Sequence, residues 1–192
     1  MNKCAGKIVD WLIEKQVVDC SKRKIYEAGC RQLLTLLLNL LGVVLLGVLF
    51  HALWESLVLS ALFMFLQRYA GSYHARTRLQ CYIGSMGMIL VNLLVLRVQV
   101  PCSIQWIMLL LLLFVIQLQA PVESRNKRLD DREKEVYHKR AQKICVGYGV
   151  FWVICAWRNL ENISWILLLA LMDVFILQVL GRADLVILKK NG

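Results

Sequence analysis

One polar stretch of the sequence brings a histidine and a cysteine within seven residues of each other. His74 and Cys81 lie in residues 67–82, between two apolar runs. A free thiol is only a few per cent thiolate near neutral pH, and a neighbouring imidazole or cationic surroundings raise that fraction. Arg76 and Arg78 supply local positive charge. The pair therefore predicts nucleophilic catalysis, in which His74 takes the proton of Cys81 and later passes it to a leaving amine.

The spacing of this pair constrains the backbone between them. On one unbroken α-helix, residues seven apart share a face but lie roughly 10 Å apart along the axis, beyond hydrogen-bonding distance. The backbone must therefore break between His74 and Cys81, or the pair must come together when substrate binds. Gly71 and Ser72 precede the histidine and allow the chain to turn. The alternative is a packed thiol and an unrelated surface imidazole.

The remaining cysteines and histidines do not suggest a metal site. The chain has seven cysteines, with no CxxC pair, and three scattered histidines. A structural zinc site normally needs four closely spaced ligands. Most of the cysteines lie in or beside apolar runs, where a free thiol behaves as a small hydrophobe. We therefore expect neither a metal nor a cofactor.

Six apolar segments must position the histidine–cysteine loop. Apolar residues make up 59% of the chain, and a helix that crosses a membrane needs about 20 residues. The shorter segments must borrow flanking residues, tilt, or thin the bilayer locally. The sequence predicts an all-α polytopic membrane protein, a single domain over residues 1–192 with about six short transmembrane helices. The segments cover residues 33–50, 53–66, 83–96, 104–118, 144–157 and 163–180.

The basic residues alternate between these segments. Lys and Arg number seven before the first segment, then none, three, one, eight and one in the successive connections, and three after the last segment. Cytoplasmic loops of membrane proteins carry an excess of Lys and Arg. The alternation therefore predicts a cell-membrane protein with both termini and residues 67–82 and 119–143 in the cytoplasm. The net charge of +10 then reflects orientation in the bilayer and not nucleic-acid binding.

Two long polar segments lie outside the predicted spans, one before the first span and one between the fourth and the fifth. In residues 1–31, apolar residues recur at helical spacing among charged ones, which predicts an amphipathic helix on the inner leaflet or a short helix packed on the cytoplasmic loops. From Leu129 onward, residues 119–143 have the mixed charges of an exposed helix with pairs four residues apart. Arg125, Lys127 and Arg128 at its basic start are candidates for binding an acidic partner, or belong to a solvated connector.

Three motifs in the sequence are RYAGSYHA from Arg68, CYIGS from Cys81 and APVESRNKR from Ala120. Together they resemble the AgrB family, the accessory gene regulator peptidases of Gram-positive bacteria. The resemblance extends from the amphipathic start to the last apolar segment. One departure is Ser72, where the family usually has a second glycine. The resemblance implies that His74 and Cys81 are the catalytic histidine and the cysteine nucleophile.

The resemblance also implies supporting roles and a substrate. Arg68, Gly71 and Ser85 match the residues that surround the catalytic pair in the family motif. The substrate would be an AgrD-like propeptide with an amphipathic leader and an acidic tail. Cleavage before the tail would give a peptidyl thioester on the enzyme cysteine. A thiol or hydroxyl of the propeptide would then close a thiolactone or lactone ring, yielding a quorum-sensing peptide.

The family's basic stretch is the natural partner of an acidic tail, and the family is expected to form a homodimer in the lipid bilayer. The residues of this chain that match the stretch are Arg125, Lys127 and Arg128.

A different class of function is a small peptide transporter or export channel without proteolysis. Asn92, Asp173 and Gln178 lie within apolar segments, and polar groups inside a membrane often mark a transport pathway. Hydrogen bonding between helices is the alternative explanation for the same residues. An aspartyl or metallo-protease is not indicated, because only Asp173 lies deep in a span and no HExxH motif occurs.

Overall fold

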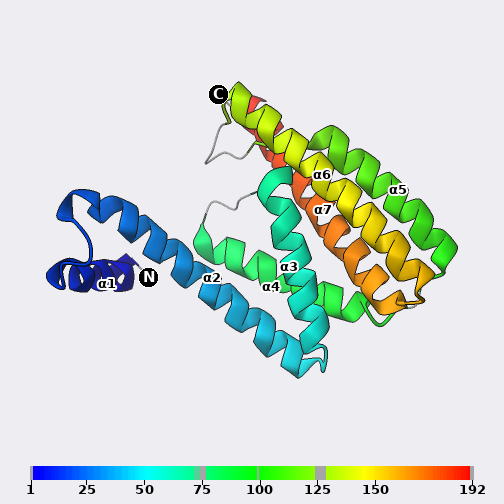
Figure 1. Cartoon of the computed structure of the whole chain (residues 1–192), viewed down its shortest axis with the longest axis horizontal. Helices are drawn as coiled ribbons and strands as arrows, with labels where there is room; N and C mark the ends of the chain where they lie inside the picture. The colour runs from blue at the N-terminus through cyan, green and yellow to red at the C-terminus, as the bar shows by residue number, and fades with distance from the viewer. Residues whose placement is uncertain (1, 72, 74–76, 99, 124–128, 191–192) are drawn as a thin grey trace.

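The computed structural model describes residues 2–71, 73, 77–98, 100–123 and 129–190, and most of these residues are helical (Figure 1). Each of the six predicted apolar segments falls on one helix of α2 to α7, with Phe50 and Leu96 lying one residue past a helix end, which confirms the all-α prediction. The helices are α1 (Asn2–Glu14), a short 3-10 turn η1 (Cys20–Lys22), α2 (Arg23–Leu49), α3 (Leu53–Ala70), α4 (Arg78–Val95), α5 (Cys102–Gln119), α6 (Asp131–Trp157) and α7 (Glu161–Lys190).

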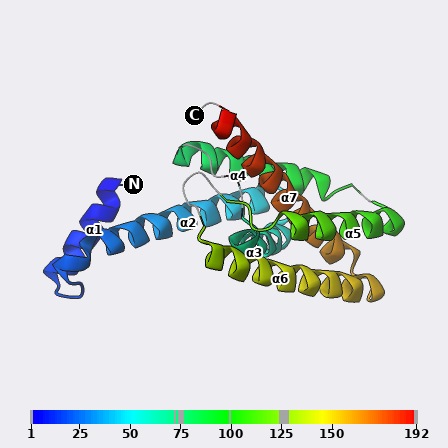
Figure 2. The same ribbon diagram turned by 90° about the horizontal axis from the view of Figure 1, so that it is seen from above.

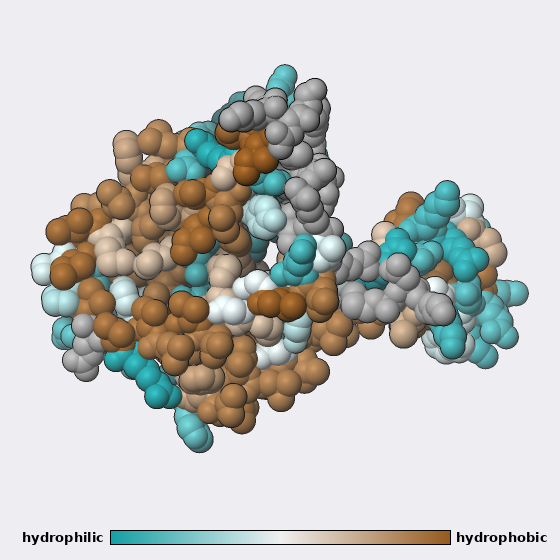
Figure 3. Space-filling model, turned by 180° about the vertical axis from the view of Figure 1, so that it is seen from behind, coloured by the Kyte–Doolittle hydropathy of each residue, from teal (hydrophilic) through white to brown (hydrophobic). Residues whose placement is uncertain are grey.

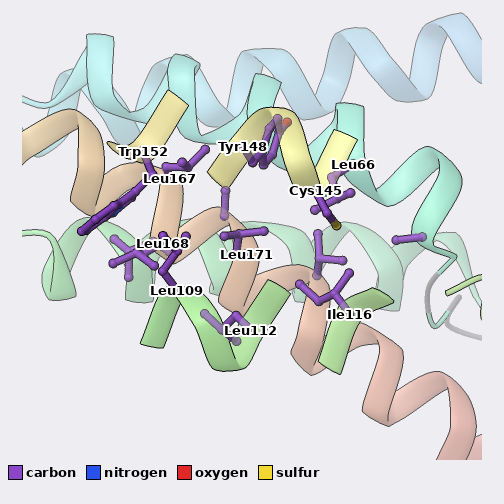
Figure 4. Close-up of a cluster of buried hydrophobic side chains, with 14 of the residues drawn as sticks. Leu66, Leu109, Leu112, Ile116, Cys145, Tyr148, Trp152, Leu167, Leu168 and Leu171 are labelled. Carbon is purple, nitrogen blue, oxygen red and sulfur yellow. The ribbon is translucent and has the colours of Figure 1, made fainter. Parts of the chain in front are cut away.

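Four helices, α3, α5, α6 and α7, form a bundle around a leucine-rich core (Figures 1 and 4). Trp152 of α6 is fully buried. Its ring packs edge to face against that of Trp106 of α5, with 4.6 Å between the ring centroids. The hydroxyl of Tyr148 donates to the carbonyl oxygen of Leu62 at 2.7 Å, so the polar end of this aromatic side chain is satisfied inside the bundle. The largest buried side chains of the core include Leu66, Leu109, Ile116, Leu167, Leu168 and Leu171.

The helix α1 and the N-terminal part of α2 form an arm that extends away from this bundle, whereas the rest of α2 packs against α3 and α4 (Figures 1 and 2). Ala5 and Val9 of α1 are fully buried, and Arg23 of α2 pairs with Asp10 at 2.6 Å. The predicted amphipathic helix is therefore present, and it packs on α2. Its Trp11 is 56% exposed, which leaves an apolar surface available to a membrane.

Much of the outer surface is apolar, as expected where the bilayer is the solvent. Figure 3 shows hydrophobic side chains over much of one face of the bundle and hydrophilic ones gathered at the far end of the arm. Within the described part of the chain, three helical segments are long and apolar enough to cross a membrane, namely Cys20–Leu49, Cys102–Gln119 and Glu161–Ile187, whereas Leu79–Val95 is shorter. The fold is that of a helical membrane protein.

Local sequence signals determine where two of the helices begin. Thr77 starts α4: its hydroxyl oxygen accepts from the amide N–H of Gln80 at 3.2 Å, and the Gln80 side chain accepts from the amide of Thr77 at 3.3 Å. Asp130 and Glu133 form the same capping box at the start of α6. The predicted exposed helix of residues 119–143 is therefore confirmed from Asp131 onward. It continues without a break into the apolar segment 144–157, and Lys139 and Glu135 form a pair at 2.6 Å on it.

Candidate active site

Cys81 lies at the beginning of α4, one turn after its N-cap. Its amide N–H donates to the Thr77 carbonyl at 3.1 Å, and the hydroxyl of Ser85 donates to the Cys81 carbonyl at 2.9 Å. The side chain is exposed and the thiol is free. The N-terminal end of an α-helix favours negative charge, because the N–H groups of its first turn and the positive end of its macrodipole lie there. The site can therefore present a sulfur nucleophile to a peptide at the end of the helix.

The helix that contains Cys81 does not continue from α3. The helix α3 ends at Ala70 and α4 begins at Arg78, after Thr77 with extended backbone. His74 itself lies outside the described residues, as do the basic candidates Arg125, Lys127 and Arg128.

The end of α3 contacts the start of the basic segment, residues 119–128. Gly71 ends α3 with φ of +76° and pairs with Val122 in an isolated parallel bridge. The amide N–H of Val122 donates to the carbonyl of Ala70 at 3.0 Å. A β-carbon at position 71 would overlap the backbone of Val122, so only glycine fits this close approach. The structure thus joins the beginnings of the two loops that the sequence singled out, although 50 residues separate them in the chain.

The helix α7 holds this junction from the other side. Gln178 is fully buried, and its side-chain amide donates to the carbonyl of Ala70 at 3.0 Å. The amide N–H of Tyr73 donates to the Leu177 carbonyl at 3.1 Å, and the Arg182 guanidinium donates to the Gln119 carbonyl at 3.2 Å. These contacts were not predicted from the sequence. The only signal for them was the polar Gln178 inside an apolar run.

Two residues of α6 hold the start of the basic segment. The ring Nδ1 of His138 lies 2.7 Å from the carbonyl oxygen of Ala120, which can only accept, so Nδ1 carries the proton. The ammonium of Lys134 pairs with Glu123 at 2.9 Å. The hydrogen bond to Glu123 and its negative charge raise the pKa of Lys134 above its usual value, because both stabilise the charged ammonium.

Arg68 lies in the last turn of α3, next to an aromatic cluster. It is exposed, and its guanidinium carbon lies 5.9 Å from the ring centroid of Tyr69. The Arg140 guanidinium lies 5.4 Å from the same ring, whose edge meets Tyr137 at 5.9 Å between centroids. Such cation–π contacts at exposed sites contribute about 0.5–1 kcal/mol each. The described contacts of Arg68 are therefore with the end of α3 and not with Cys81.

The three polar residues that the sequence singled out inside apolar segments each make a hydrogen bond. The Asn92 side-chain amide of α4 donates to a carboxyl oxygen of Asp173 of α7 at 2.6 Å, and both residues are buried. Gln178 donates to Ala70 as described above. These bonds match the interhelical interpretation and give no support to a transport pathway. Among the described residues, no group of three or more His, Cys, Asp or Glu side chains could hold a metal ion.

Comparison with protein families shows which family the chain belongs to. The accessory gene regulator B (AgrB) family matches residues 5–181 of the 192-residue chain. The chain belongs to the AgrB family. No curated protein and no solved structure matches the chain. Membership of the AgrB family supports a peptidase-type role in processing an agr quorum-sensing propeptide at a membrane, with an AgrD-like propeptide as the substrate.

The glycine at the junction gives a first prediction. We expect Gly71→Ala to lower propeptide cleavage by about tenfold or more, because a side chain at positive φ costs about 1–2 kcal/mol and this one also displaces Val122. Gly29→Ala is the matched control, since Gly29 is helical, exposed and without a neighbour within 4 Å. Cleavage and insertion should be measured on the same membranes. Wild-type cleavage by Gly71→Ala would contradict the role given to the junction.

Proposed function

We propose that this AgrB-family chain is a cysteine endopeptidase that removes the acidic tail of an AgrD-like propeptide and promotes its cyclisation. Cys81 is the nucleophile and His74 is the general base and acid. The observation that carries the proposal is the free, exposed thiol of Cys81 at the start of α4, directly after the loop that contains His74. Family membership supports a peptidase-type role in propeptide processing.

The proposed reaction has two acyl transfers. In the first, the sulfur of Cys81 attacks the carbonyl carbon before the tail, the C–N bond breaks, and the leaving amine takes the proton that His74 removed from the thiol. The peptide is then a thioester of Cys81. In the second, a thiol or hydroxyl of the propeptide attacks the thioester carbonyl and the C–S bond breaks. This step closes a thiolactone or lactone ring and returns the proton to Cys81.

Two energetic demands follow from this scheme. Exchange between two thioesters is nearly balanced, whereas forming a thioester from an amide is uphill, so the reaction depends on removal of the released tail. Water would hydrolyse the intermediate, and the site must therefore limit its access. A nucleophile at the edge of the bilayer satisfies the second demand better than one on an open loop. An amphipathic leader on the same leaflet would also raise the effective concentration of substrate.

Recognition of the tail is assigned to Arg125, Lys127 and Arg128. These residues follow Val122, which is bonded to Ala70 at the start of the histidine loop. The junction between the two loops supports a position for the basic cluster near the His74 loop. An acidic tail held there would place the preceding peptide bond toward the nucleophile. Charge-assisted hydrogen bonds from Arg and Lys to carboxylates are short and strong enough to fix such a register.

The proposed topology places both termini and both loops in the cytoplasm, with about six spans. A single cysteine introduced at Ser124, which lies outside the described residues, should react with a membrane-impermeant maleimide only when the cytoplasmic face is open. The reason is that the basic residues of 119–143 resist translocation. Labelling of intact cells from outside would show that residues 119–143 lie outside the cell. The proposed cytoplasmic location of the site would then be wrong.

The most direct test of the proposed function is mass spectrometry of the purified protein incubated with a propeptide and quenched in acid. The expected product is a covalent adduct on Cys81 whose mass equals that of the propeptide without its tail. Hydroxylamine should release the adduct, because it cleaves thioesters. Tail release with no adduct, in a variant that lacks Cys81, would assign the cleavage to other residues.

A further inference from the structure

A buried glutamine in α7 joins three segments at the candidate site. The side chain of Gln178 is fully buried, and an amide in an apolar setting is costly unless its polar atoms are bonded. Its Nε2 donates to the Ala70 carbonyl at 3.0 Å, and the same carbonyl accepts from the amide of Val122 at 3.0 Å. One carbonyl oxygen therefore links the end of α3, the start of the basic segment, and α7.

This carbonyl needs such partners because of its place in the helix. The last four carbonyl groups of an α-helix have no partner within the helix, and Ala70 is the final residue of α3. Gly71 turns the chain away, so the carbonyl is left to Gln178 and Val122. The neighbouring residue of α7, Leu177, accepts from the amide of Tyr73 at 3.1 Å. Two successive residues of α7 thus hold the chain at both ends of the turn that leads into His74.

We propose that Gln178 is a positioning residue of the active site, which fixes the point where the histidine loop leaves α3. The inference rests on the proposed function, because it gives the junction a role in the reaction of His74 and Cys81. Gln178 touches the backbone of the loop and acts on the reacting groups through it. Its Oε1 has no hydrogen-bond partner among the described residues, so the contribution seen in the structure is made by the donating nitrogen.

A second buried glutamine provides a matched control. Gln105 of α5 is 7% exposed, and its Nε2 also donates to a backbone carbonyl, that of Val100, at 2.9 Å. It contacts Ser164 near the start of α7, whereas Gln178 lies about four turns further along the same helix. The two residues share chemistry and burial and differ in their distance from the junction.

The test compares Gln178→Met with Gln105→Met, because methionine keeps the length of the side chain and removes both polar atoms. With a synthetic AgrD-like propeptide as substrate, Gln178→Met should lower kcat by about 10–100-fold and change KM by less than about twofold, as expected when reacting groups are misplaced but capture is retained. Gln105→Met should stay within about threefold of wild type. Equal losses in the two variants, or a Gln178→Met variant with wild-type kcat, would overturn the proposal.

A conservative variant keeps the test decisive if Gln178→Met inserts badly. Gln178→Glu replaces the donating nitrogen by an oxygen, which can donate to the Ala70 carbonyl only when the carboxyl is protonated. Its kcat relative to wild type should therefore rise as the pH is lowered. A purely space-filling role would leave this ratio low or near one at every pH.

Cross-linking separates failure of this inference from failure of the proposed function. With all native cysteines replaced, cysteines at Tyr73 and Leu177 should form a disulfide readily, because the backbones of these residues are hydrogen-bonded. Gln178→Met should slow that cross-link by about fivefold or more. An unaltered cross-linking rate would overturn the inference. Absence of any propeptide cleavage by the wild-type chain would instead refute the proposed function, and the cross-linking result would still measure the junction.

Discussion

Replacing Cys81 by alanine is expected to lower propeptide cleavage by about 10³-fold or more, and His74→Ala should do the same. In the proposed reaction the two residues act as one proton-transfer unit, so the double variant should be no worse than either single one. Both variants should insert normally. For Cys81→Ala the reason is that the side chain is exposed at the start of α4 and packs against no core. Tail release per unit of inserted protein is the quantity to measure.

The matched control replaces the other cysteines together. Two of them are buried in the bundle, Cys145 fully and Cys155 at 2% exposure, so alanine there costs packing and should lower thermal stability modestly. Cleavage should remain measurable, since none of these cysteines belongs to α4. A well-inserted variant without activity would refute the single-nucleophile account. The replaced residues are Cys4, Cys20, Cys30, Cys102, Cys145 and Cys155.

The helices were predictable from the sequence because each is encoded locally. Inside a bilayer no water is present to bond the backbone N–H and C=O groups of an apolar run. An α-helix satisfies these groups within one segment, without hydrogen bonds to other segments. The second segment, 53–66, was too short for a comfortable span and gains flanking residues up to Ala70 in α3. Gly71 was predicted to let the chain turn, and it does so with a positive φ.

The junction at the candidate site was not predictable, because it depends on contacts between distant segments. Gln178 and Ala70 are 108 residues apart in the chain. A glutamine in an apolar run signals an interhelical partner but does not say which carbonyl it will meet. The position of α1 has the same origin: its amphipathic pattern predicted the helix, whereas its packing on α2 depends on the arm that α2 forms beyond the bundle.

Reversing two charges of the basic segment is the second large effect that we expect. Arg125→Glu with Lys127→Glu should lower tail cleavage by about 10-fold or more, while alkylation of Cys81 by a small neutral reagent stays near the wild-type rate. Single surface ion pairs contribute about 0–1 kcal/mol, and salt screens them over roughly 8–10 Å. Several acting on one tail can still fix the register of the scissile bond, and the loss should be in capture, seen as a higher KM.

A compensating substrate distinguishes recognition from a general effect of charge. A propeptide in which the acidic tail residues are replaced by lysine should be cleaved poorly by the wild type and should partly restore cleavage by the double variant. If the basic residues only set the topology, the double variant would insert abnormally and no change of substrate would help. Insertion, Cys81 alkylation and cleavage should therefore be measured on one preparation. Because Val122 is bonded to Ala70 at the start of the histidine loop, failure of the reversed tail with normal insertion would mean that the junction serves loop position alone, and tail recognition would have to lie elsewhere in the protein.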